Sequence, residues 1–346
     1  TALLELLDDQ RFARNVLPSD PQLARVMVRR LKSDLVDANG KRIYPERRLE
    51  ALPVEYPEDE RAARRQLEAY IKKREGGADG GRALDHFVHQ LLRKRLSSSP
   101  AAFAATLERH VATIEGRAAG DRSQKKFDDR ILRRAIAKTE EDYADDAQRD
   151  AAEAEAIEEA GKHVRPPTDE ERRMLDRLRS WAQQAARRTD AKASAVLDYL
   201  TRHLKDGDGW TNERVILFTE YRATQQWMHE ILAAQGFGAD RLALIYGGMD
   251  PKEREAVKAA FQANPSDSPV RILLATDAAS EGIDLQNHCH LMIHLEIPYN
   301  PNVMEQCEPG HRASTARPPR GSPARSGHAT SRSPDGEVPP FREGRA

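Results

Sequence analysis

The residues best suited to chemistry follow three short apolar runs, at 215–218, 242–246 and 272–275. Hydroxyl groups and main-chain N–H groups in such positions can hold phosphates in register without reading bases, and a carboxylate can accept a hydrogen bond from a sugar hydroxyl. This combination favours contacts to a nucleic-acid backbone and a nucleotide. The candidate residues are Thr219, Gly247, Thr276, Asp277, Gly282 and Asp284.

Each of these residues alone also has an ordinary structural interpretation. Gly282 could be a turn glycine, Asp284 a helix cap and Thr276 a strand end. Their grouping behind one pattern of apolar runs favours the functional interpretation.

The elements that must position these residues can be predicted from the alternation of strands and helices. Apolar runs at 215–218, 242–246, 272–275 and 290–295 alternate with amphipathic helical stretches. Gly236 is placed to end one helix, and Asp250 with Pro251 is placed to begin another. This alternation predicts a parallel α/β sheet with helices on both faces, whose ligands bind at the carboxyl ends of the strands.

The region before residue 207 has a different composition. Residues 58–204 are mostly helical in pattern and heavily charged, and 48–56 alternates polar and apolar residues like a strand. Residues 121–159 have few large apolar side chains, which predicts a solvated helix or partial disorder. The acidic stretch 140–146 is interpreted as solvated surface.

Composition limits the classes of protein that fit. With 346 residues, 39% hydrophobic and 32% charged, the chain can bury a core in some regions only. A net charge of −1 gives no overall attraction to nucleic acid, so such binding must be local. Two cysteines, Cys289 and Cys307, and the lack of a long apolar run predict a cytoplasmic protein with no membrane role. The first residue, Thr1, fits a fragment.

A cluster near the end of the α/β pattern could suggest a metal site. His288, Cys289, His290 and His294 lie close together, and the three histidines would share a strand face by period two. Zinc ligands usually lie on loops or helix turns at other spacings. Packing is therefore favoured and no metal site is predicted.

The stretches 215–221, 246–254 and 271–286 resemble motifs IV and V of superfamily two helicases, and 293–306 resembles the approach to motif VI. The bacterial Swi/Snf-type branch, with its RapA-like and DISARM-associated members, is the most similar. The resemblance implies a RecA-like second helicase lobe. In it, Thr276 and Asp277, and more weakly Thr219 and Gly247, would contact the nucleic-acid strand. The residues facing ATP would be Gly282, Asp284 and Gln306.

Two departures from the family pattern bear on activity. The sequence contains no Gly-x-x-x-x-Gly-Lys-Ser/Thr and no Asp-Glu-x-His, so ATP and Mg²⁺ are expected only with a missing first lobe, which a separate polypeptide could supply. The family's motif VI reads Gln-x-x-Gly-Arg-x-x-Arg, whereas Gln306 is followed by Cys-Glu-Pro-Gly-His-Arg. The motif VI arginines are thus lacking, and a reading-frame change or truncated gene copy is one hypothesis for this disruption.

The resemblance divides the chain into four parts. Residues 1–57 would be the end of the first lobe and a connector, 58–206 a charged helical region and 207–306 the second lobe. Residues 307–346, rich in Pro, Arg and Ser, would be a disordered tail. The expected function is a fragment of an ATP-dependent nucleic-acid translocase or helicase, with duplex DNA the favoured partner and no ATPase activity alone. The alternative is a non-catalytic interaction or scaffold protein with a vestigial lobe.

Overall fold

The computed structural model describes residues 12, 17, 19, 21–23, 35–41, 48–75, 82–119, 145–161, 165–279, 285 and 287–296. The predicted tail at 307–346 and most of the predicted connector at 1–57 lie outside these residues.

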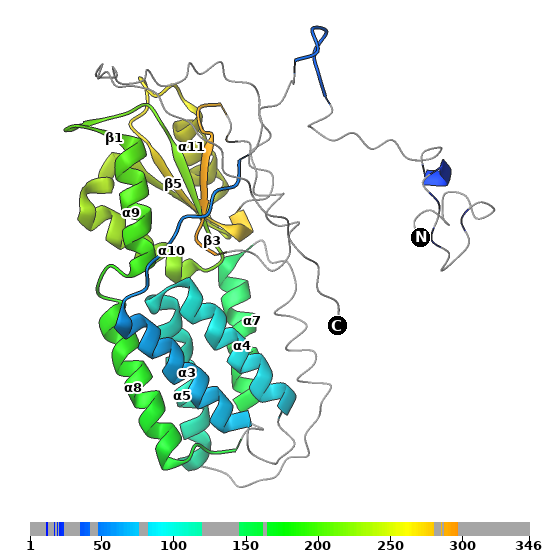
Figure 1. The fold of residues 1–346 in the computed structure, drawn as a ribbon, viewed down its shortest axis with the longest axis vertical. Helices are drawn as coiled ribbons and strands as arrows, with labels where there is room; N and C mark the ends of the chain where they lie inside the picture. The colour runs from blue at the N-terminus through cyan, green and yellow to red at the C-terminus, as the bar shows by residue number, and fades with distance from the viewer. Residues whose placement is uncertain are drawn as a thin grey trace, which may run out of the picture. The chain divides into compact units, whose positions relative to one another are not determined.

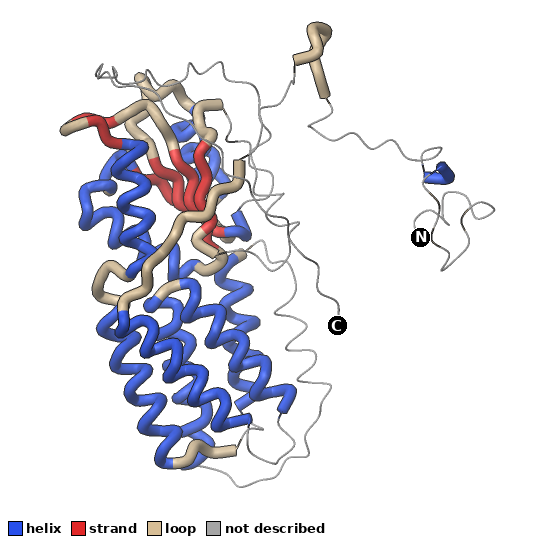
Figure 2. Tube along the Cα trace, in the orientation of Figure 1, coloured by secondary structure: helices blue, strands red, loops and turns tan. Residues whose placement is uncertain are grey.

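A four-stranded parallel sheet organises the second half of the chain (Figures 1 and 2). Its strands are β3 (Val215–Thr219), β4 (Leu242–Ile245), β5 (Ile272–Thr276) and β6 (Leu291–His294), in the order β4-β5-β3-β6. Every residue of the two central strands is buried, because helices cover both faces and leave no side for polar residues. The predicted parallel α/β fold is confirmed.

Alternate residues of the central strands enter two separate cores. On one face, Leu217 and Leu274 join Val196 of α9 (Ala191–Leu204) and Met228 of α10 (Arg222–Leu232). On the other face, Phe218 and Leu273 join Phe261 of α11 (Pro251–Gln262). This division follows from the two-residue period of a strand. The helix α9 therefore packs in the core of the sheet.

Local signals fix the ends of the covering helices. The Asp250 carboxylate accepts hydrogen bonds from the backbone N–H groups of Lys252 and Glu253 at 2.9 and 3.2 Å, and Pro251 occupies the first turn of α11. Beyond α10, a π-helical turn (Ala233–Phe237) contains Gly236 at φ 80°, a conformation that favours glycine. A 3₁₀ turn (Ala239–Arg241) then leads into β4. The predicted start of α11 and the predicted glycine stop are confirmed.

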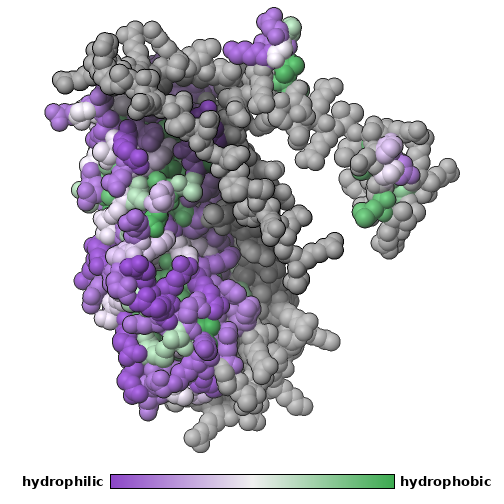
Figure 3. Space-filling model, in the orientation of Figure 1, coloured by the Kyte–Doolittle hydropathy of each residue, from purple (hydrophilic) through white to green (hydrophobic). Residues whose placement is uncertain are grey.

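The region before the sheet is helical, as predicted. Its helices are α3 (Glu58–Glu75), α4 (Arg82–Ser98), α5 (Pro100–Ala119), α7 (Asp146–Gly161) and α8 (Asp169–Ala185). They share one apolar core that includes Leu67, Leu92, Phe103 and Leu178. Figure 3 shows that the face of these helices turned toward the viewer is mainly hydrophilic, which fits their high charge.

Two local predictions are wrong. Residues 48–57 contain no strand, since no neighbouring strand pairs with them, although Leu52 packs against the core of the sheet. The helix α7 is not polar all round, because Ala152, Ala156 and Ile157 are buried. Alanine side chains hide such a face from a search for large apolar residues, but they allow close packing.

A short hairpin joins α9 to the sheet. It consists of β1 (Lys205–Asp206) and β2 (Gly209–Trp210), which pair antiparallel.

None of the helices in the described part of the chain has the length and apolar character that crossing a membrane requires.

Candidate nucleic-acid interface

The carboxyl ends of β3, β4 and β5 form one edge, which we call the strand-end rim and define as residues 219–221, 246–248 and 276–277. Thr219 and Thr276 are partners in the parallel register of β3 and β5, and both are buried. The backbone N–H of Gly247 donates to the Thr276 hydroxyl at 3.3 Å. The rim thus brings Thr219, Gly247, Thr276 and Asp277 together, as parallel strands require.

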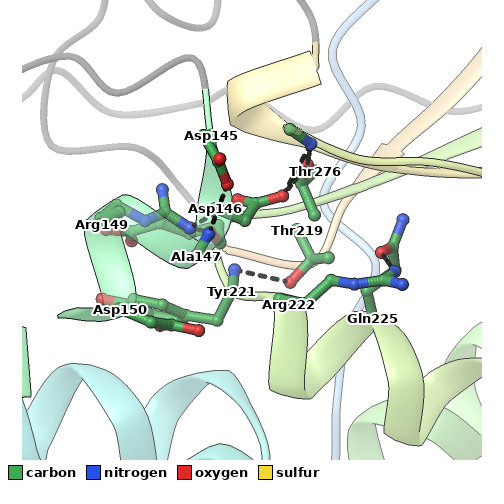
Figure 4. A network of polar contacts seen from close by, with 12 residues as sticks. Asp145, Asp146, Ala147, Arg149, Asp150, Thr219, Tyr221, Arg222, Gln225 and Thr276 are labelled. Atoms are coloured by element: carbon green, nitrogen blue, oxygen red, sulfur yellow. Dashed lines mark hydrogen bonds and ion pairs between the residues drawn. The ribbon is translucent and has the colours of Figure 1, made fainter. Parts of the chain in front are cut away.

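An aspartate from the helical region occupies the centre of this rim (Figure 4). The Oδ2 atom of Asp146 accepts from the Thr276 hydroxyl at 2.7 Å and from the Gly247 N–H at 2.8 Å. Asp146 is only 2% exposed. The interpretation of 140–146 as solvated surface is therefore wrong for Asp146, because its carboxylate finds two donors in the rim. Residues 140–144 lie outside the described residues.

The start of α7 explains why Asp146 is available for this contact. Asp145 precedes the helix, and its Oδ1 atom accepts from the backbone N–H of Ala147 at 2.8 Å, as a helix N-cap does. The neighbouring carboxylate can then point into the rim. Two adjacent aspartates divide the tasks of capping the helix and contacting the sheet.

Glycine at position 248 permits the approach of α7. Gly248 has φ +83°, and a Cβ atom built on it would lie 2.7 Å from Oδ1 of Asp145. A side chain here would therefore be strained and would also collide with the helix cap.

Two arginines attach the helical region to the loop after β3. Arg149 of α7 donates to the carbonyl oxygen of Glu220 and forms an ion pair with Asp146 at 3.3 Å. The guanidinium of Arg95 in α4 lies 3.7 Å from the ring centroid of Tyr221, in cation–π geometry. Burial raises the pKa of Tyr221 well above its ordinary value, so the ring stays neutral.

The Thr219 hydroxyl contacts a second carboxylate. It donates to Oε1 of Glu296 at 3.2 Å, and the Glu220 N–H donates to Oε2 at 3.1 Å. Ser98 of α4 also donates to Glu296. Burial raises the pKa of Glu296, and the nearby Lys192 ammonium opposes this shift. Glu296 therefore joins the helical region to the end of β3.

Asp277 lies in acidic surroundings. Burial raises the pKa of its carboxyl to about 7, with Glu220 and Glu296 adding to the shift and Arg149 opposing it. The carboxyl is thus half-protonated near neutral pH, and its ionised form would repel a phosphate. The contact expected between Asp277 and a nucleic-acid strand stays a prediction.

The expected ATP-facing residues Gly282, Asp284 and Gln306 lie outside the described residues. The histidines near them do not share a strand face as predicted, because β6 begins at Leu291, after His288 and His290. His294 stacks on Phe218 with ring centroids 5.4 Å apart. In the described ranges no three His, Cys, Asp or Glu residues are grouped so that they could hold a metal ion.

Sequence reasoning missed Asp146, Arg149, Arg95 and Gln225. The Gln225 side chain of α10 donates to the carbonyl oxygens of Ile245 and Leu274 at 2.8 and 2.7 Å and so joins β4 to β5. The only available signal was that Gln225 falls among apolar residues on the buried face of α10. No signal in the sequence distinguished Asp146 from the acidic residues around it.

Residues 192–308 match the family described as the helicase conserved C-terminal domain. Among curated proteins, the chain is 30% identical over 133 residues to the uncharacterized ATP-dependent helicase YqhH of Bacillus subtilis (strain 168), covering 38% of this chain and 20% of YqhH. It is 33% identical over 107 residues to DEAD-box ATP-dependent RNA helicase 35 of Arabidopsis thaliana, covering 31% and 16%. The chain thus spans a fifth or less of the length of these relatives.

Solved structures resemble the chain at low identity. The Hef helicase domain of Pyrococcus furiosus has a TM-score of 0.47 at 15% identity, covering 77% of this chain and 53% of the Hef chain. The SWI2/SNF2 ATPase C-terminal domain of Sulfolobus solfataricus has a TM-score of 0.26 at 18% identity, covering 38% and 58%. The family match and the ATP-dependent helicase relatives thus make residues 192–308 of this chain similar to the helicase conserved C-terminal domain.

Proposed function

We propose that this chain supplies the second motor lobe of an ATP-dependent nucleic-acid translocase of the Swi/Snf type, and that its strand-end rim contacts the nucleic-acid backbone. The observation that carries the proposal is the convergence of the Thr276 hydroxyl and the Gly247 N–H on one carboxylate oxygen, at 2.7 and 2.8 Å. Two donors at the ends of neighbouring strands therefore already bind an oxyanion.

A phosphate oxygen can accept hydrogen bonds from these donors in the same way as a carboxylate oxygen. Both are anionic acceptors, and charge-assisted hydrogen bonds are short and about twice as strong as neutral ones. Hydroxyl and backbone N–H groups that bind phosphates carry no sequence information, so binding through them would not depend on base sequence. This suits a motor that tracks along a strand, with duplex DNA the proposed track.

The ATP side of the proposal rests on the resemblance alone. Gly282, Asp284 and Gln306 would face the nucleotide, and ATP with Mg²⁺ would bind between this lobe and a first lobe that these residues do not include. The sequence contains neither a P-loop nor an Asp-Glu-x-His, and the arginines of motif VI are replaced after Gln306. We therefore expect no ATP hydrolysis by this chain alone. The family match favours this motor lobe over the scaffold alternative.

Site-directed photo-crosslinking tests contact at the rim. A benzoylphenylalanine replaces Met249, which is half-buried and follows Gly248, and a matched chain carries the same group at exposed Thr201 on α9. With saturating fluorescent duplex DNA, ultraviolet light is expected to give an adduct from position 249 and little from 201. Equal adducts from both positions, or none from 249, would refute the proposed interface.

Phosphate release tests the catalytic part separately. The chain with ATP, Mg²⁺ and DNA is expected to release phosphate at the rate of the buffer alone. DNA-stimulated turnover would show that the chain needs no first lobe.

A further inference from the structure

The rim is covered from the helical side at every one of its strands. The start of α7 lies against the ends of β4 and β5 through Asp146, and Arg149 binds the loop after β3. Arg95 of α4 lies on Tyr221 in the same loop. The covering groups come from two helices, so the arrangement is not a single chance contact.

We infer that the helical region autoinhibits the rim, with the Asp146 carboxylate standing in for a backbone phosphate on Thr276 and Gly247. The inference rests on the proposed function. It adds that the first turn of α7 must withdraw before nucleic acid can bind.

Binding of the carboxylate and of a phosphate at these donors excludes each other. A threonine hydroxyl and a backbone N–H each have one proton to donate. The Thr276 proton points to Oδ2 of Asp146 at 2.7 Å, and the Gly247 proton is shared between the same oxygen at 2.8 Å and the Thr276 hydroxyl oxygen at 3.3 Å. Asp146 and Thr276 are also 2% and 0% exposed, so a phosphate cannot enter beside the carboxylate.

Charge makes the exclusion stronger. Near the rim, the carboxyl groups of Glu220, Asp277 and Glu296 interact electrostatically, with Lys94 paired to Glu220 at 3.8 Å and Lys192 near Glu296. The cation that faces them from α7 is Arg149, already paired with Asp146 at 3.3 Å. A phosphate approaching the closed rim therefore meets the Asp146 carboxylate, whose partner Arg149 lies on the same helix and leaves the rim with it.

The closed arrangement is held by contacts that can open without unfolding the sheet. The first turn of α7 is attached to the rim by ion pairs and hydrogen bonds, whereas the buried Ala152, Ala156 and Ile157 lie further along the helix. Such polar contacts exchange readily for contacts with water or with a ligand. The core of the helical region includes Ala160 near the end of α7, whereas none of the three cores includes Asp146, so the first turn can leave the rim while the rest of the helix stays packed.

The test compares two variants of the full chain that each remove one negative charge from α7. Asp146→Asn keeps the side-chain shape but replaces the charge-assisted acceptor with a neutral one. Asp150→Asn is the control, because Asp150 pairs with Arg95 at 3.3 Å without contacting the rim, and Glu153 keeps Arg95 paired. Fluorescence anisotropy with labelled duplex DNA at low salt gives the affinities.

Asp146→Asn is expected to bind DNA about tenfold more tightly than the wild-type chain, the usual effect of weakening a hydrogen bond to a charged group. Asp150→Asn should stay within about twofold of wild type, since it removes the same charge without freeing the donors. Equal affinities for the two variants, with adducts still formed from position 249, would overturn autoinhibition and leave the proposed interface standing. No binding by any chain would overturn both.

Hydrogen exchange on the wild-type chain gives a second readout, which decides the matter if Asp146→Asn does not fold. The Ala147 N–H bonds Oδ1 of Asp145 and the Arg149 N–H bonds its carbonyl oxygen, at 2.8 and 3.2 Å. Saturating DNA is expected to speed exchange in the peptide covering 145–150 and leave 58–75 unchanged. Unchanged or slower exchange at 145–150 would contradict withdrawal of α7.

Discussion

The hydroxyl of Thr276 donates to the carboxylate of Asp146 across 2.7 Å, although 130 residues separate the two in the chain. This contact joins the end of a central strand to the first turn of a helix in another part of the fold. It uses the same donor that the helicase resemblance assigns to nucleic acid. The stability and the binding of this chain are therefore expected to be coupled at one position.

Replacing Gly248 with alanine should destabilise the chain more than replacing Gly207 does. Both residues have positive φ, at +83° and +58°, but a Cβ at 248 would lie 2.7 Å from Asp145 while 207 is open. Each substitution costs about 1–2 kcal/mol for the left-handed backbone, and Gly248→Ala should cost about 0.5–2 kcal/mol more, because the Asp145 side chain must move and lose its capping hydrogen bond. Urea unfolding midpoints measure the difference. Equal midpoints would contradict the claim that the Asp145 cap against Gly248 stabilises α7.

Replacing Gln225 should destabilise the chain more than replacing its exposed neighbour Gln226. Gln225→Met leaves the carbonyl oxygens of Ile245 and Leu274 without their donor in a buried site. The free energy of unfolding is expected to fall by about 2–3 kcal/mol. Gln226→Met changes an exposed residue of the same helix and should stay within about 0.5 kcal/mol. Similar losses for both variants would exclude the strand-joining role of Gln225.

Arg95 and Arg93 lie on the same helix, α4, but Arg95 forms a buried ion pair and Arg93 an exposed one. Arg95→Met removes the cation over Tyr221 and leaves Glu153, whose side chain is 8% exposed, without its partner. A loss of about 3–5 kcal/mol is expected from unpairing a buried charge. Arg93→Met breaks a pair whose side chains are 32% and 48% exposed and should cost under about 1 kcal/mol. Thermal unfolding followed by circular dichroism ranks the two, and a larger effect for Arg93 would contradict the account.

Asp277 should make stability depend on pH. Its pKa is raised from 3.8 to about 7 in the folded chain, so the folded state binds more protons than the unfolded state between these values. Stability is therefore present in full below about pH 4, is lost as the pH rises to about 7, and changes no further above it. Asp277→Asn cannot ionise and avoids this loss.

Asp277→Asn should accordingly be more stable relative to the wild type at pH 8 than at pH 5. The expected change in this difference is about 1–2 kcal/mol, from about 1.4 kcal/mol per pKa unit with a discount for partial exposure. Chemical denaturation at the two pH values measures it. A difference that did not vary with pH would show that the carboxyl is ionised throughout.

The sheet could be predicted because its signals are local. The apolar run at 272–275 predicts β5, which is buried on both faces. Asp250 and Pro251 mark the start of α11 within a few neighbouring residues. The joining of Thr219, Gly247 and Thr276 followed as well, because parallel strands end at one edge.

The cover over the rim could not be predicted in the same way. Asp146 belongs to an acidic stretch in which every carboxylate is equally polar, and only the tertiary fold decides which one meets Thr276. The buried face of α7 consists largely of alanines such as Ala152 and Ala156, which give little periodic signal in the sequence. Long-range contacts of single polar residues leave no pattern in one sequence.

The most direct test of the account is a double-mutant cycle on DNA affinity with Asp146→Asn and Thr276→Val. In the wild-type chain the Thr276 hydroxyl binds the Asp146 carboxylate when the rim is closed and the phosphate when it is open. Thr276→Val weakens both contacts, so DNA affinity should change by less than about threefold. In the Asp146→Asn chain the hydroxyl contributes mainly to DNA binding, and Thr276→Val should weaken that binding by about tenfold. The same change in both backgrounds would contradict the claim that Asp146 and the nucleic-acid backbone compete for Thr276.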